Sequence, residues 1–224
     1  MNLSMKILLI DTCGDMGSVA LAETGEDAPK IVSTTLPGRS TSERLVATLR
    51  ELAGTADFAL TELDTVVVVN GPGSFTGVRV GVSAAKGLCE ALGLPVVAIS
   101  RLAVLTEGCG LGRVVAALDA GRGEFYCGVY QDGSCLHEAL VTRMILEEQV
   151  EGARLVTCEP LVAVALAELA PEVLDAPTAE AALPIALRRI AASEFDDVGA
   201  LDANYLRRTD AEIFVNQQRG RTPA

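Results

Sequence analysis

Residues 70–81 are the stretch of this chain that most restricts its fold. The sequence there is Asn-Gly-Pro-Gly-Ser-Phe-Thr-Gly-Val-Arg-Val-Gly. An apolar run, Val66 to Val69, comes before it and is typical of a buried strand, while the residues up to Leu92 are typical of a helix. A strand, a glycine-rich turn and a helix form the layout in which backbone N–H groups can point at an anion. The sequence therefore predicts an α/β protein with a tight turn at these glycines.

Two interpretations of this turn are open. A phosphate-binding loop of the Walker type needs Lys directly after its last glycine, and here Val78 follows Gly77. A dinucleotide fingerprint needs a third glycine three residues after Gly73, and Thr76 stands there. We therefore favour a structural turn, whose glycines let the following helix pack closely on the sheet.

Charge and composition narrow the function classes. The chain has 224 residues and a net charge of −12, which argues against a nucleic-acid-binding surface of its own. Its one histidine, His137, excludes a metal site with two histidine ligands, and its six cysteines include no Cys-x-x-Cys pair, so we expect no bound metal. We find no signal peptide and no apolar run of membrane-spanning length. We expect a cytoplasmic protein that does not bind membranes.

The order of predicted elements repeats once along the chain. Each half begins with a strand that ends in an aspartate, Asp11 or Asp119, turns on glycine and returns as a second strand. A third strand, a helix, a further strand and a further helix follow in both halves. Strands are predicted at 6–11, 18–23, 31–36, 65–70, 95–99, 114–119, 124–130, 136–141 and 155–158, and helices from 41, over 76–92, from 100, and over 145–150, 161–169 and 181–193. The plan is a duplicated βββαβα arrangement.

Four motifs make the chain resemble a known family. They are Ile10-Asp11-Thr12, Gly71-Pro72-Gly73-Ser74-Phe75-Thr76-Gly77-Val78-Arg79, Asp119-Ala120 with Gly123-Glu124-Phe125-Tyr126, and Tyr205-Leu206-Arg207. In this order they resemble the bacterial TsaB family, also called YeaZ. The resemblance implies an α/β protein with the actin-like (ASKHA, ribonuclease H-like) fold of two βββαβα subdomains. We place these at residues 5–110 and 111–213, and we expect 214–224 to be a disordered tail.

The resemblance implies a non-catalytic subunit. Proteins of the TsaB family pair with the paralogue TsaD, which carries the metal and the active site, and with the ATPase TsaE. Together they attach a threonylcarbamoyl group to an adenosine next to the anticodon of tRNA, so we expect tRNA to meet this chain only indirectly. We expect no cofactor on this chain alone, and ATP or ADP at a subunit interface stays open. Without its partner, the chain is expected to form a homodimer.

Two groups of site residues follow from the resemblance. Helices of the first subdomain are expected to dock on TsaD, through Glu43, Arg44, Leu45, Leu49, Ser74, Phe75, Thr76, Arg79, Ala84 and Leu88. Asp11, Thr12, Asp119 and Gly121 mark a vestigial nucleotide cleft, and no residue is assigned a catalytic role. Gly121 stands where relatives usually have arginine, which gives the Asp-x-Gly pattern of actin-like ATPases.

Two other functions stay open at this point. A stand-alone actin-like ATPase or kinase would use Asp11 and the turn at Asp119, but the second half is short and shows no Gly-Gly adenosine loop. A peptidase would need a base beside a serine or cysteine, and His137 lies in a predicted strand. The accessory-subunit interpretation is therefore favoured.

Overall fold

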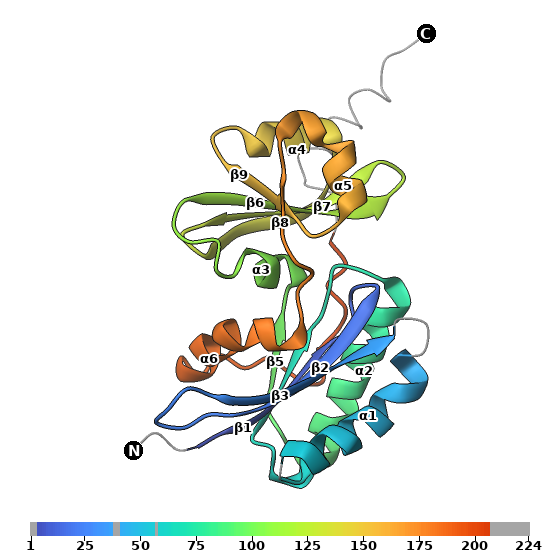
Figure 1. The fold of residues 1–224 in the computed structure, drawn as a ribbon, viewed down its shortest axis with the longest axis vertical. Coiled ribbons are helices and arrows are strands. Elements are labelled where there is room, and N and C mark those ends of the chain that lie inside the picture. The colour runs from blue at the N-terminus through green and yellow to red at the C-terminus, as the bar shows by residue number, and fades with distance from the viewer. Residues whose placement is uncertain (1–3, 38–40, 57, 207–224) are drawn as a thin grey trace. The chain divides into compact units, whose positions relative to one another are not determined.

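The computed structural model describes residues 4–37, 41–56 and 58–206. The chain divides into two units, whose elements are labelled in Figure 1. Of the described residues, the first unit contains those up to Glu107 together with Ala176–Asn204, and the second contains Gly108–Asp175, Tyr205 and Leu206. Each unit is built on one five-stranded sheet.

The sheet of the first unit has the strand order β3-β2-β1-β4-β5. Strands β1 to β3 form an antiparallel meander, and β4 and β5 run parallel to β1. The strands are β1 (Lys6–Asp11), β2 (Met16–Glu23), β3 (Lys30–Pro37), β4 (Thr65–Val69) and β5 (Val96–Ile99). The helices are α1 (Thr41–Ala56), α2 (Phe75–Leu92), α3 (Arg101–Thr106) and α6 (Leu183–Ala191), with short 3-10 turns at Leu60–Glu62 and Ala179–Ala182.

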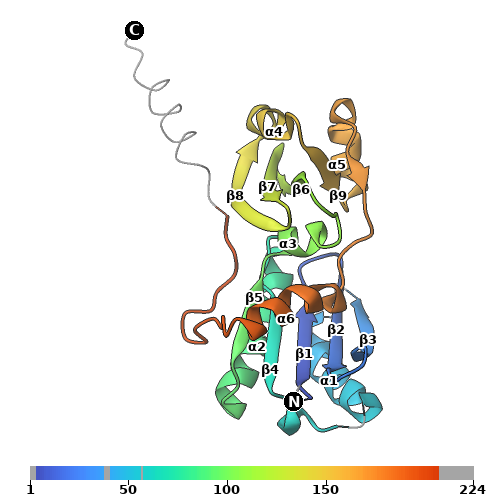
Figure 2. The same ribbon diagram turned by 90° about the vertical axis from the view of Figure 1, so that its left-hand side faces the viewer.

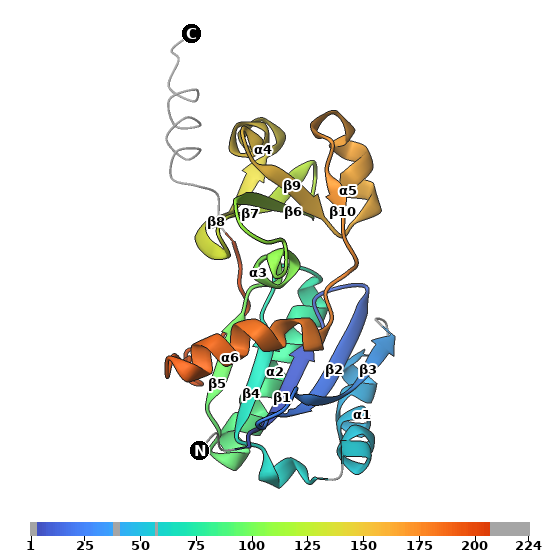
Figure 3. The same cartoon turned by 60° about the vertical axis from the view of Figure 1, so that its left-hand side comes forward.

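Helices cover both faces of this first sheet. Figures 2 and 3 show α1 and α2 on one face and α6 on the other. As a result every residue of β4 is buried, and the strand is a continuous apolar run after Thr65 rather than an alternating one. Such runs are typical of parallel strands that are covered on both sides.

The sheet of the second unit repeats the first, with the order β10-β9-β6-β7-β8. Its strands are β6 (Arg113–Gly121), β7 (Glu124–Gln131), β8 (Ser134–Thr142), β9 (Arg154–Thr157) and β10 (Glu172–Val173). Its helices are α4 (Arg143–Val150) and α5 (Pro160–Ala165), followed by a 3-10 turn at Ala167–Leu169. Leu146 of α4 and Val162 of α5 belong to one buried cluster with the sheet, so both helices cover the same face (Figure 3). The duplicated βββαβα plan is confirmed.

The predicted helix over 161–169 is wrong in its second half. Helix α5 ends at Ala165, and a 3-10 turn and the short strand β10 follow. Ala170 adopts a left-handed conformation, with φ 48°. It precedes Pro171, and the residue before a proline is disfavoured in the α conformation. The proline therefore marks the end of helical structure, which the apolar pattern alone did not show.

The structure also differs from the expected domain division. Residues 176–204 were expected in the second subdomain, 111–213, but they pack in the first unit. Leu183 and Ala186 are buried in the core of the first unit. Asp196 Oδ2 accepts a hydrogen bond from the Ala98 amide at 2.7 Å, which fixes the segment along β5. An apolar stripe on a helix does not show which of the two sheets the helix covers. The sequence alone therefore could not show that residues 176–204 pack in the first unit. The expected tail, 214–224, lies outside the described residues.

The first turns of α2 pack directly against the loop that follows β1. The Ser74 amide donates to the carbonyl of Cys13 at 2.8 Å, and Thr12 Oγ1 donates to the carbonyl of Gly77 at 2.6 Å. A Cβ at Gly77 would overlap the carbonyl oxygen of Thr12, and one at Gly73 would overlap that of Cys13. Glycine is therefore required here by the close approach of two backbone segments.

Two glycines of α2 test this constraint. Gly77→Ala is expected to lower the free energy of unfolding by at least about 2 kcal/mol, because its Cβ must displace the Thr12 backbone. Gly87→Ala, where a Cβ meets nothing within 4 Å, is expected to raise it by up to about 1 kcal/mol, because alanine favours helix. Urea unfolding of both variants measures the difference. Equal effects of the two substitutions would contradict the close approach.

The placement of residues 176–204 has its own test. Asp196→Ala is expected to lower the free energy of unfolding by about 1–2 kcal/mol, since the Ala98 amide loses its acceptor and Arg189 Nη1 loses an ion-pair partner at 3.2 Å. Glu194→Ala is the control, because Glu194 pairs with the same Arg189 at 3.8 Å but through a side chain that is 63% exposed. Denaturant unfolding, with hydrogen exchange at the Ala98 amide, reports the result. Unchanged exchange at Ala98 in Asp196→Ala would argue against the contact.

Candidate functional site

The N-terminus of α2 is the place where a phosphate loop would bind its anion. In this chain, oxygen atoms of the protein itself lie at the N-terminus of α2. Ser74 Oγ accepts from the Gly77 amide at 3.3 Å as the N-cap of α2, and the Ser74 amide donates to the Cys13 carbonyl. The carbonyl oxygens of Thr12 and Cys13 fill the space that the glycines leave. The geometry agrees with the structural interpretation of the turn.

Asp11, at the end of β1, is enclosed by the same loops. Its side chain is buried, and its Oδ1 accepts from the Cys13 amide at 2.8 Å. Burial raises the pKa of the Asp11 carboxyl, while the Cys13 amide and the charge of Arg101 oppose that rise. Arg101 follows β5, is itself buried, and places its Nη2 3.0 Å from where a Cβ of Gly14 would be. The protein thus supplies a cation of its own near this carboxylate.

Asp119 lies at the corresponding turn of the second unit. Its Oδ1 accepts from the Gly121 amide at 2.9 Å, and its own amide donates to Glu159 Oε2 at 2.7 Å. Gly121 has a φ of 77°, so the Asp-x-Gly pattern here serves a tight turn in the β6–β7 hairpin. Asp11 and Asp119 belong to different units, and the expectation that they share a vestigial nucleotide cleft stays a prediction.

Within residues 4–37, 41–56 and 58–206, no group of three or more His, Cys, Asp or Glu side chains is placed to hold a metal ion. His137 is exposed on β8, where it pairs with Val129 of β7. No helix in the described part of the chain is both long and apolar enough to cross a membrane.

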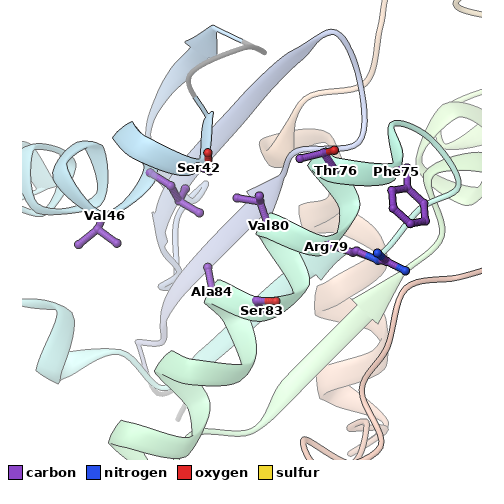
Figure 4. A pocket seen from close by; sticks show the side chains of 9 residues that line it. Ser42, Val46, Phe75, Thr76, Arg79, Val80, Ser83 and Ala84 are labelled. Atoms are coloured by element: carbon purple, nitrogen blue, oxygen red, sulfur yellow. The ribbon is translucent and has the colours of Figure 1, made fainter.

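A groove of about 490 Å³ lies between α1 and α2 of the first unit. It is lined by Ser42, Leu45, Val46, Phe75, Thr76, Arg79, Val80, Ser83 and Ala84 (Figure 4). Val46 and Phe75 are 59% and 60% exposed, so two large apolar side chains face solvent on neighbouring helices. Figure 4 shows Phe75 and Arg79 side by side on the flank of α2 away from α1. The Arg79 guanidinium carbon lies 3.7 Å from the centre of the Phe75 ring.

Eight of the ten predicted docking residues divide into three groups in the structure. Phe75, Thr76, Arg79 and Ala84 line the groove as expected, and the N-cap Ser74 is exposed beside it. Glu43 and Arg44 are exposed on α1, but Arg44 lines a separate groove between α1 and β3. Leu88 is half-buried. For these residues, contact with a partner stays a prediction.

The remaining two predicted docking residues, Leu45 and Leu49, are only 2% exposed and pack in the core of the first unit. Contact of these two with a partner also stays a prediction. Leu45 closes the floor of the groove, and Val46 beside it points outward. The sequence held a signal for the outward direction of Val46. Leu45, Leu49 and Leu52 have helical spacing and form one apolar stripe, which is buried against the sheet. Val46 is apolar but lies outside that stripe, so it must face away from the sheet. Ser42, Val80 and Ser83 also line the groove and were not predicted from the sequence.

Comparison with known proteins identifies relatives of this chain. The family model TsaD, tRNA N6-adenosine threonylcarbamoyltransferase, matches residues 31–156. The tRNA threonylcarbamoyladenosine biosynthesis protein TsaB of Escherichia coli is 33% identical over 156 residues, which are 67% of this chain and 66% of that protein. The TsaB of Bacillus subtilis is 36% identical over 61% of this chain and 60% of that protein. The match thus spans about two thirds or less of these curated relatives.

A solved structure extends the similarity to nearly the whole chain. YeaZ from Pseudomonas aeruginosa superposes with a TM-score of 0.73 and 30% sequence identity, over 90% of this chain and 100% of that one. The two five-stranded sheets and this likeness establish the actin-like, ribonuclease H-like fold. The chain belongs to the TsaB (YeaZ) family.

Proposed function

We propose that this chain is a non-catalytic scaffold subunit in the formation of threonylcarbamoyladenosine in tRNA. In this proposal it pairs with the paralogue TsaD, and the ATPase TsaE joins the pair. The transfer takes place on an adenosine near the tRNA anticodon, in the cytoplasm. The support is that relatives of the chain in Escherichia coli and Bacillus subtilis are named as TsaB proteins of this biosynthesis.

The observation that carries the proposal is the exposed groove between α1 and α2. Val46 and Phe75 present large apolar surfaces to solvent on two neighbouring helices. Exposed apolar surface of this kind is typical of a binding site for another protein. A groove between helices suits an amphipathic helix of the partner, whose apolar side chains would cover both residues.

Several features favour a supporting role over catalysis for this subunit. The amide of Ser74 at the N-terminus of α2 is hydrogen-bonded within the chain, and the Asp119 carboxylate is engaged by its own turn. The net charge of −12 suits a subunit that leaves tRNA contact to its partners. We further propose that any ATP or ADP lies at a subunit interface. Without TsaD, a second copy of the chain would cover the same groove, giving a homodimer.

A substitution on α1 tests the groove. Val46→Asp is expected to weaken binding of purified TsaD from the same organism by roughly a hundredfold, because it places a charge in an apolar contact. Val164→Asp is the matched control, since Val164 is a 75% exposed valine on α5 of the other unit. Isothermal titration calorimetry gives both affinities, and circular dichroism checks that both variants fold. Undiminished binding by Val46→Asp would refute the proposed docking surface.

A substitution of Asp11 distinguishes the scaffold hypothesis from the ATPase alternative. Asp11→Asn keeps an oxygen that can accept from the Cys13 amide, but it removes the negative charge. For a scaffold, the threonylcarbamoyl transfer rate of the assembled complex is expected to stay within about twofold of wild type. The isolated chain is expected to hydrolyse no ATP in either form. ATP turnover by the isolated wild-type chain that Asp11→Asn abolishes would support the ATPase alternative instead.

A further inference from the structure

The outer edge of the first sheet is open along β3. In the described part of the chain, β3 is the last strand of its sheet and has no strand on its outer side (Figures 2 and 3). It pairs with β2 over its full length without a register shift, and its charged residue and its proline, Lys30 and Pro37, stand at its two ends. The outer backbone N–H and C=O groups of such a strand form a template on which another strand can pair.

The other three sheet edges in the described structure are protected. At β5 the Asp196 amide donates to the carbonyl of Val96 at 2.9 Å, and Asp196 Oδ2 accepts from the Ala98 amide, so this segment covers the edge. In the second unit, β10 has only two residues, and the pairing of β8 with β7 contains a register shift. A covering segment, a short strand and a bulge are usual ways of preventing edge pairing, and β3 has none of them along its length.

One face of α1 runs beside this open edge. Arg44, Thr48, Glu51 and Thr55 recur at helical spacing, and together with residues 32–36 of β3 they line a groove of about 340 Å³. Arg44 and Glu51 are exposed, and neither side chain has a hydrogen bond or an ion pair within the described residues. The groove thus presents one positive and one negative charge, about two helical turns apart, next to a strand edge.

We propose that β3 pairs antiparallel with β3 of a second copy of the chain, about a two-fold axis, so that the two sheets join into one. The inference goes beyond the proposed function, because it uses the edge of the sheet and not the groove between α1 and α2. The two grooves share no lining residue. A copy that is bound at β3 therefore leaves the groove between α1 and α2 available to another protein.

The charges on α1 favour a second copy as the partner. A two-fold axis reverses the direction of the helix in the copy, so Arg44 of each chain faces Glu51 of the other. The row of charges is therefore complementary to itself, and each dimer contains the matched pair twice. The strand suits the same partner, because residues 31–36 are valine, isoleucine, leucine, serine and threonine, most of which favour strands.

The spacing of the elements allows the strands and the helices to meet together. Helix α1 contacts both β3 and β2, so it lies over the seam between these two strands. Neighbouring strands are about 4.8 Å apart, which places the two copies of α1 roughly 10 Å from each other when β3 pairs with its copy. Packed helices lie at about this distance. The second copy would thus fill the groove between α1 and β3 with its own strand and helix.

A charge swap tests the proposal by analytical ultracentrifugation. The background is Val46→Asp, which removes self-association through the groove between α1 and α2. In this background we expect a dimer that Glu51→Arg weakens by roughly tenfold or more, because each Arg44 then faces an arginine. Adding Arg44→Glu to Glu51→Arg reverses both charges and is expected to restore the affinity to within about threefold of the background.

Glu148→Arg in the same background is the matched control. Glu148 is an exposed glutamate on α4 of the other unit, so the substitution changes the net charge by the same amount. Its dimer affinity is expected to stay within about twofold of the background. Equal weakening by Glu148→Arg would show a general charge effect and overturn the proposal. Circular dichroism checks that the variants fold, which is expected because Arg44 and Glu51 have no side-chain bonds to lose.

Hydrogen exchange locates the contact on the strand. Every second amide of β3 points outward, and these amides are expected to exchange more slowly as the concentration of the Val46→Asp protein rises. A chain that stays monomeric in this background, or a double charge swap that fails to recover the dimer, refutes pairing at β3. The proposed function is judged separately by TsaD binding, since Val46→Asp can abolish that binding whether or not β3 pairs.

Discussion

The contact on which the first unit depends is the meeting of two backbones, the loop after β1 and the first turns of α2. The carbonyl oxygens of Thr12 and Cys13 lie where side chains at Gly77 and Gly73 would be. Hydrogen bonds from Ser74 and Thr12 join the two segments. Because α2 starts at this contact, its position over the sheet is fixed from its first turn. Phe75 and Arg79 lie in the first turns of α2, so the position of the helix sets the directions in which their side chains point.

The same contact occupies space beyond the carboxyl end of β1. In open α/β sheets, ligands usually bind beyond the carboxyl ends of parallel strands. At the end of β1, Asp11 is held by the Cys13 amide, and Arg101, which follows β5, lies buried near it. The groove between α1 and α2 is a separate feature of this unit.

Helix α1 shows how one element serves both the core and the groove. Leu45 and Leu49 are buried against the sheet, while Val46 is exposed in the groove. Neighbouring residues on a helix point about 100° apart, so adjacent apolar residues serve different faces. The buried leucines hold the helix in place, and the exposed valine is available to a partner. A substitution at Leu45 would therefore disturb the fold, whereas one at Val46 changes the surface.

The sequence by itself determined the kind and order of the elements. The apolar run of β4, the glycine turn and the duplicated aspartate-ended strands predicted the βββαβα plan, because strand and helix periodicity are local properties of the chain. The motifs around Asp11, Gly71 and Asp119 also sufficed to identify the family. They did not decide whether the glycines served a phosphate or a packing contact, since both uses require the same residues.

Only the tertiary structure decided which surfaces meet. It placed residues 176–204 in the first unit, although their apolar stripe suits any sheet. It put Leu45 inside and Val46 outside, although both are apolar members of one helix. It also showed that the anion-binding end of α2 is occupied by Thr12 and Cys13, which lie about 60 residues earlier in the chain. The physical reason is the same in each case: burial is set by contacts between segments distant in sequence, and local periodicity carries no information about the partner.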